Sequence, residues 1–182
     1  MTAPKPGRKK LILQPRTKPL EERVIFANKS VTPSEKQAPA LSEEAANAQI
    51  TEDVKEFFNV RDLDEAEVYF TTLPPRYHHS LVNKLVSSAV ESKEPDARLV
   101  ADLFTRAKNK GLCSPDAFQE GLTPMAEIVE DVAIDAPKAW SLFAAMVSGA
   151  ELDERRRTRL ASKSTNIDKV LGLLYLKEYP IF

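Results

Sequence analysis

Apolar side chains recur every three or four residues through most of the chain, and this spacing limits what the chain can fold into. In the stretch 62–73 the apolar positions are Ala66, Tyr69, Phe70 and Leu73, which share one face of a helix. No stretch alternates apolar and polar residues clearly enough to predict a strand. The pattern therefore predicts an all-α fold, an antiparallel array of roughly six to eight helices joined by short loops.

Start and stop signals divide this pattern into elements. Thr51 is expected to cap a first helix over 52–60, and Asp62 with Glu65 opens the second in a form close to a capping box. Further starts and stops are expected at Pro74-Pro75, Pro95, Gly111 and Ser114-Pro115, with Pro124 as a candidate kink. The last two helices with a predicted start begin at about Ala136 and at Ile167, the latter continuing to residue 179.

Residues 1–50 differ from the rest in composition and charge. They hold six of the 13 prolines and a single aromatic residue, Phe26, and residues 1–40 carry a formal charge of +6, which leaves −7 on the remainder. Such a segment cannot bury enough apolar area to offset its loss of conformational entropy. We therefore expect a disordered, basic, proline-rich arm over 1–50 and a helical body over 51–182, large enough to fold alone.

Two interpretations of the arm stay open. Leu11, Ile12 and Leu13 form a small apolar group between cations, which suits either a solvated linker or a short motif that docks on RNA or on a partner. If the arm binds RNA, the contacting cations are expected among Lys5, Arg8, Lys9, Lys10, Arg16 and Lys18.

The chain lacks the residues that characterise several functional classes, including secreted, membrane-spanning and catalytic proteins. The single Cys113 excludes an internal disulfide and a cysteine zinc site, and no apolar run approaches the roughly 18 residues of a membrane span. The amino terminus has no signal-peptide core, so a soluble, intracellular, cytoplasmic protein is expected. His78 and His79 point about 100° apart on a helix, so one metal could hardly bind both, and surface or boundary positions are expected for them. No glycine-rich phosphate loop and no nucleophile–histidine arrangement is present, so we expect no enzyme, no cofactor and no small-molecule substrate.

The stretch VEDVAIDAPKAW, residues 129–140, holds two carboxylates four residues apart. Asp131 and Asp135 come from one local element, unlike a glycosidase pair, and the stretch lacks the glycine and distal glutamate of a calcium loop. Pro137 disfavours a helical conformation at Ala136, so a turn is expected at about 131–136, with Asp135 as a cap of the next helix. Capping leaves Asp131 and its acidic neighbours unexplained, and these residues would attract a cationic protein surface.

Three stretches resemble the MI domain, a helical module of eukaryotic translation initiation factor 4 gamma and of the programmed cell death 4 tumour suppressor. They are 62–92, with its Glu-Ala pair and its Glu-Ser end, 112–131, with its Phe-x-x-Gly step, and the acidic corner at 129–140. Together they span about residues 52–150. Within this span, residues 88–98 and 128–140 resemble the scaffold factor of filamentous fungi more than the tumour suppressor. The resemblance implies a HEAT-like α-α superhelix.

The resemblance also implies a partner. MI domains bind the DEAD-box RNA helicase initiation factor 4A through acidic and proline residues on one edge, which here correspond to Glu91, Asp131, Asp135 and Pro137. Asp131 stands where several members have glutamate, which shortens its reach. The expected function is therefore a helicase-binding module of cap-dependent translation initiation. An RNA-binding adaptor working through the basic arm, or an inhibitory MI protein, is the alternative.

Overall fold

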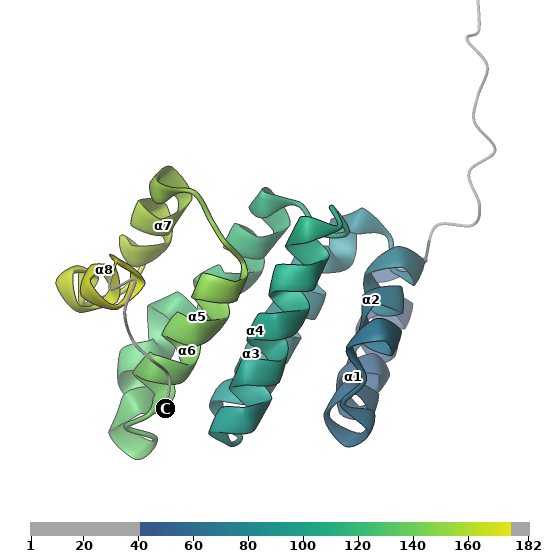
Figure 1. The fold of residues 1–182 in the computed structure, drawn as a ribbon, viewed down its shortest axis with the longest axis horizontal. Coiled ribbons are helices and arrows are strands. Elements are labelled where there is room, and N and C mark those ends of the chain that lie inside the picture. The colour runs from purple at the N-terminus through teal and green to yellow at the C-terminus, as the bar shows by residue number, and fades with distance from the viewer. Residues whose placement is uncertain (1–40, 176–182) are drawn as a thin grey trace, which may run out of the picture. The chain divides into compact units, whose positions relative to one another are not determined.

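The computed structural model describes residues 41–175, and this part of the chain is helical with no strand (Figure 1). The elements are α1 (Glu43–Val60), α2 (Leu63–Thr72), the short 3₁₀ helix η1 (Pro75–Tyr77), α3 (His78–Val90), α4 (Glu94–Asn109), α5 (Pro115–Asp135), α6 (Ala139–Gly149), α7 (Glu154–Ala161) and α8 (Ile167–Tyr175). This confirms the all-α prediction. The expectations for the basic arm, including its disorder and its six candidate RNA-contacting cations, lie on residues outside the described part, except at 41–50.

Consecutive helices form hairpins that stand side by side. Helix α3 packs extensively on α5, and α4 on α6, so that the odd-numbered and even-numbered helices form two layers (Figure 1). Helices α7 and α8 extend the same arrangement, α7 against α5 and α8 against α6. The predicted antiparallel, HEAT-like hairpin array is confirmed.

Two glycines allow the closest helix contacts. A Cβ atom on Gly121 of α5 would lie 2.5 Å from the backbone oxygen of His79, and one on Gly149 of α6 would lie 2.3 Å from that of Ala101. These positions join α5 to α3 and α6 to α4, the two most extensive pairings of the array. Between the layers, the rings of Phe104 and Phe118 meet edge to face with centroids 5.2 Å apart.

The N-cap residues predicted from the sequence are correct for two helices and wrong for a third. The Asp62 side chain accepts from the amides of Asp64 and Glu65, at 2.8 and 3.2 Å, as predicted. Ser114 caps α5 as predicted, accepting from the Ala117 amide at 3.1 Å. Thr51 is not a cap, because α1 begins at Glu43 behind Ser42, whose hydroxyl accepts from the Ala45 amide.

Helix α1 therefore contains part of the predicted arm. Ala46 and Ile50 are buried and continue the apolar stripe of Val54 back by two turns, so packing extends the helix past Thr51. The Thr51 hydroxyl instead donates to the Asn47 carbonyl oxygen, 2.8 Å away, as a threonine inside a helix often does. Pro124 lies within α5, which continues through it to Asp135.

Candidate protein-docking edge

The inter-helix turns α1–α2, α3–α4 and α5–α6 meet along one edge of the array, which we call the turn edge (residues 61–62, 91–94 and 135–138). Arg61 forms an ion pair with Asp96 in the first turn of α4. The Lys138 ammonium lies 3.8 Å from the Glu94 carboxylate, which also accepts from Arg98 at 2.7 Å. Glu91 precedes Glu94 by three residues, and Glu94 contacts Lys138. Glu91 and residues 131–138 therefore lie on the same edge.

Asp131 and Asp135 lie at the end of α5 and face solvent. Within residues 41–175, neither side chain has an ion-pair or hydrogen-bond partner. The predicted capping role of Asp135 is wrong: it is the last residue of α5, and α6 begins only at Ala139, after Lys138. The helix continues further than expected because Pro137 restricts only the residue before it, Ala136.

The charges at this helix end are poorly matched to the backbone. The C-terminus of a helix carries partial negative charge, which favours cations and disfavours carboxylates. The last turn of α5 holds no basic residue, and Asp131 and Asp135 add two full negative charges there. The corner is therefore a site of negative potential that a cationic surface would relieve.

Pro137 fixes the shape of the turn. Ala136 adopts φ −123° and ψ 84°, outside the helical region, as predicted for a residue that precedes proline. Its amide donates to the Val132 carbonyl oxygen at 2.9 Å, and its own carbonyl accepts from the Ala139 amide at 2.8 Å. Pro137 itself is exposed, so the turn presents a rigid, accessible ring.

Glu91 is the C-cap residue of α3 and is exposed, in agreement with its predicted position at that helix end. It lines a surface groove of about 470 Å³ together with Phe58, Arg61, Ser92, Lys93 and Asp96. Two cations and a second carboxylate share this groove, so the potential around Glu91 is less negative than at the α5 corner.

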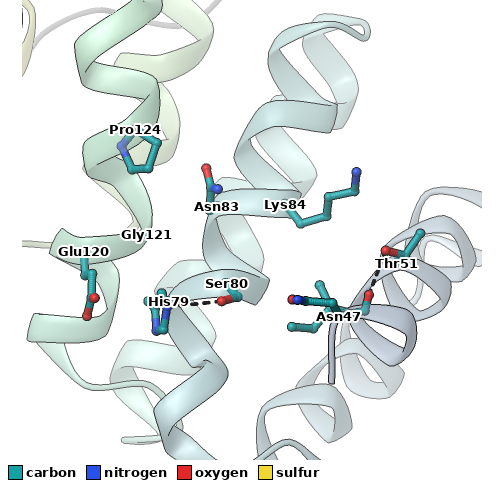
Figure 2. A pocket seen from close by; sticks show the side chains of 10 residues that line it. Asn47, Thr51, His79, Ser80, Asn83, Lys84, Glu120, Gly121 and Pro124 are labelled. Carbon is teal, nitrogen blue, oxygen red and sulfur yellow. Dashed lines mark hydrogen bonds between the residues drawn. The ribbon is translucent and has the colours of Figure 1, made fainter. Parts of the chain in front are cut away.

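A second groove of about 410 Å³ lies on the odd-numbered layer, between α1, α3 and α5 (Figure 2). Its lining includes Ile50, His79, Lys84, Glu120 and Pro124, and the Ser80 hydroxyl is 3.2 Å from Nε2 of His79. Sequence reasoning did not predict this groove, because it depends on the spacing between three helices.

The two adjacent histidines diverge, as their helical spacing implies. His78 is buried, with Nε2 3.0 Å from the Leu73 carbonyl oxygen and its ring edge to face with Phe70. The expectation of a surface or boundary position was therefore wrong for His78, because it packs on Phe70 and bonds to Leu73. His79 is half-buried.

Among the described residues no group of three His, Cys, Asp or Glu side chains could hold a metal ion. None of the described helices combines the length and apolarity of a membrane span.

Sequence reasoning missed two exposed isoleucines beside the acidic corner. Ile128 is 47% exposed and Ile134 77%, although both lie in α5, whose other large apolar residues are mostly buried. The signal was available in the helical phase, because neither residue falls on the buried stripe through Phe118, Leu122, Met125 and Val129.

Comparison with known proteins places this geometry in context. A family model described as the MA3 domain matches residues 46–154. The eukaryotic translation initiation factor 4G of Triticum aestivum is 29% identical over 103 residues, covering 55% of this chain and 7% of that protein. The factor 4G of Arabidopsis thaliana is 25% identical over 136 residues, covering 73% of this chain and 8% of that protein.

A third relative has a different description. It is a von Willebrand factor A domain-containing protein of Dictyostelium discoideum, 26% identical over 112 residues, which cover 61% of this chain and 5% of that protein. The chain thus spans less than a tenth of the length of each of these three relatives.

Proposed function

The chain belongs to the MA3 domain family, which is the MI domain under another name, and on that premise we propose that it binds a DEAD-box RNA helicase of the initiation factor 4A type through the turn edge. The factor 4G relatives support a role in translation initiation, with the chain acting as a protein-interaction module. The sequence resemblance adds the proposal that it belongs to a scaffold of the fungal type. The proposal assigns the chain no catalytic step and no cofactor, and it implies a cytoplasmic location.

The observation that carries this proposal is the exposed, unpaired state of Asp131 and Asp135 at the end of α5, among the described residues. A carboxylate held at a helix C-terminus without a cation is unfavourable in the free domain. The same arrangement favours association with lysine or arginine side chains, because the partner supplies the missing positive charge. Glu91, on the same edge, is available as a weaker third contact.

Pro137 supports binding by holding the turn before the partner arrives. Each rotamer-rich side chain that is immobilised on association costs about 0.5–1.5 kcal/mol, so a turn that is already fixed loses less freedom.

Truncating one partner of a buried charged pair typically costs about 2–5 kcal/mol of binding free energy, and about 1.4 kcal/mol corresponds to a tenfold change in affinity.

The test compares two double variants of the full chain for binding to purified factor 4A helicase. Asp131→Ala/Asp135→Ala should weaken binding by more than about tenfold. Glu52→Ala/Asp102→Ala removes the same charge from exposed positions near the middle of α1 and α4, and should bind as the unchanged chain does. Equal retention by both variants would exclude the acidic corner as the docking site.

We propose that binding stimulates the helicase, in keeping with the scaffold role. We expect binding to hold the two helicase lobes in a productive arrangement and to raise ATP turnover. Adding the chain to a helicase ATPase assay measures this, and a fall in turnover would favour the inhibitory alternative instead.

RNA binding by the basic arm is a second candidate function, favoured by the +6 charge of residues 1–40. Replacing the six cations Lys5, Arg8, Lys9, Lys10, Arg16 and Lys18 by glutamine should abolish RNA binding and leave helicase binding unchanged. If the arm binds RNA, the logarithm of the binding constant should fall steeply with the logarithm of the salt concentration, because each neutralised phosphate releases counterions. Unchanged RNA binding by this variant would contradict the second candidate.

A further inference from the structure

Two large apolar side chains remain exposed on the same outer face of α5 that carries the acidic corner. Ile134 is 77% exposed and Ile128 47%, whereas Leu122, Met125 and Val129 on the opposite face of the same helix are buried. With about 100° of rotation per residue, Ile128 and Ile134 lie about 60° to either side of Asp131. They therefore flank this carboxylate on one continuous face.

Single exposed apolar residues are ordinary on protein surfaces. This face differs because its polar members are nearly all of one charge: Glu127, Glu130, Asp131 and Asp135 surround the two isoleucines. The nearest cation along the chain, Lys138, is shared with Glu94 across the turn edge. An apolar pair within a negative frame is complementary to an apolar pocket within a positive one.

We infer that Ile128 and Ile134 are apolar anchors that insert into an apolar pocket on the bound helicase, next to the lysine and arginine side chains that pair with Asp131 and Asp135. This inference rests on the proposed function for the identity of the partner. It assigns different roles in binding to the carboxylates and to the isoleucines. The carboxylates steer and orient the partner, and burial of the isoleucines slows its release.

The contribution of the two isoleucines to helicase affinity should be large enough to measure. Full burial of one isoleucine side chain is worth about 1.5–3 kcal/mol, which corresponds to roughly 10- to 150-fold in affinity. Ile134 is the more exposed in the free domain and therefore has more area to lose on binding. Ile134→Ser should weaken helicase binding at least tenfold, and Ile128→Ser less.

Serine and isoleucine have similar helix propensities, so these variants should keep α5 intact. The matched control is Val68→Ser on α2, because Val68 is 49% exposed and lies away from α5. Ile134→Leu is the rescue variant, since it restores apolar area without restoring the original shape. Thermal unfolding of each variant confirms that it is folded.

The experiment measures affinity of the full-length variants for purified factor 4A helicase at about 0.1 M and about 0.5 M salt. The loss caused by Ile134→Ser should be the same at both concentrations, whereas the loss caused by Asp131→Ala/Asp135→Ala should shrink at the higher one. Ile134→Leu should recover most of the affinity, and Val68→Ser should bind normally.

The outcomes separate this inference from the proposed function. Normal binding by Ile134→Ser and Ile128→Ser, with loss in the aspartate variant, overturns the apolar anchors and leaves the acidic docking site standing. Absence of binding by the unchanged chain overturns both. If the isoleucine variants lose self-association in sedimentation experiments and keep helicase binding, the face pairs with a second copy of the chain and the inference is wrong.

Discussion

The ammonium group of Lys138 lies 3.8 Å from a carboxylate oxygen of Glu94, which ties the α5–α6 turn to the first turn of α4. This contact brings the two sequence-distant parts of the proposed docking site, Glu91 and the 131–137 corner, onto one edge. It is also the only ion pair in the described residues that involves the turn after α5. Its removal therefore separates the roles of turn position and of local charge.

Lys138→Gln should speed helicase association at low salt by a few fold. The Lys138 side chain is 77% exposed, and such a surface pair contributes about 0–1 kcal/mol, so stability should change little. Removing its charge leaves the corner more negative, and steering of a cationic partner then strengthens. Stopped-flow association rates measure the effect, with Lys55→Gln on α1 as the control. A slower rate would mean that Lys138 acts by positioning the turn.

Asp135→Ala should leave the domain as stable as before or stabilise it by about 0.3–1 kcal/mol. The substitution removes a negative charge from a helix C-terminus and introduces the best helix former. Asp62→Ala provides the contrast, because Asp62 caps α2 through two amides and its loss should cost about 1 kcal/mol. Urea unfolding of both variants measures the difference. A loss of stability in Asp135→Ala comparable to that in Asp62→Ala would restore a capping role for Asp135.

The helices themselves could be predicted because each buries a stripe with a 3.6-residue period. The stripe of Ala66, Tyr69 and Phe70 in α2 is an example: its spacing predicts one buried face, and all three side chains are buried. Helix ends were harder, because Ser42 and Thr51 are both good cap residues and only the packing of Ala46 and Ile50 chooses between them.

The roles of the site residues stay predictions, but the exposure of some of them follows from the sequence. Glu91 and Pro137 lie at turns between helices, and Asp131 lies near the end of α5, off its buried stripe. The contact between Lys138 and Glu94 joins residues from different hairpins, so no local pattern could show it. The burial of His78 likewise depends on Phe70 and Leu73 of the preceding helix.

Gly121→Ala should destabilise the domain by about 1–3 kcal/mol. The new methyl group would lie 2.5 Å from the backbone oxygen of His79 and 2.6 Å from Cβ of Val82, so α3 and α5 would have to move apart. Gly172→Ala in α8 is the control, since a Cβ there meets nothing within 4 Å and alanine favours the helix by about 0.5–1 kcal/mol. Thermal unfolding should show opposite shifts. A gain in stability for Gly121→Ala would mean that the two helices can separate at little cost.

Alkaline pH should weaken the fold through two buried groups. Burial raises the pKa of the Cys113 thiol from 9.0 to about 12. Burial, with neighbouring carboxylates led by Glu56, raises the pKa of the Tyr69 phenol from 10.0 to about 12. Each group binds its proton more tightly when folded, so its stabilising contribution is complete below the unfolded pKa and is lost as the pH rises toward 12. The free energy of unfolding should therefore begin to fall near pH 9.

Cys113→Ala identifies the share that belongs to the thiol. Above pH 9 the thiol can contribute a slope of up to about 1.4 kcal/mol per pH unit, and the tyrosine adds its share only above pH 10. Between pH 9 and pH 10 the variant should therefore lose stability less steeply than the unchanged chain, whatever its stability at neutral pH. Urea unfolding at a series of pH values gives both slopes. Identical slopes would show that the Cys113 thiol reaches solvent in the folded protein, because only a thiol kept from water holds its proton in this range.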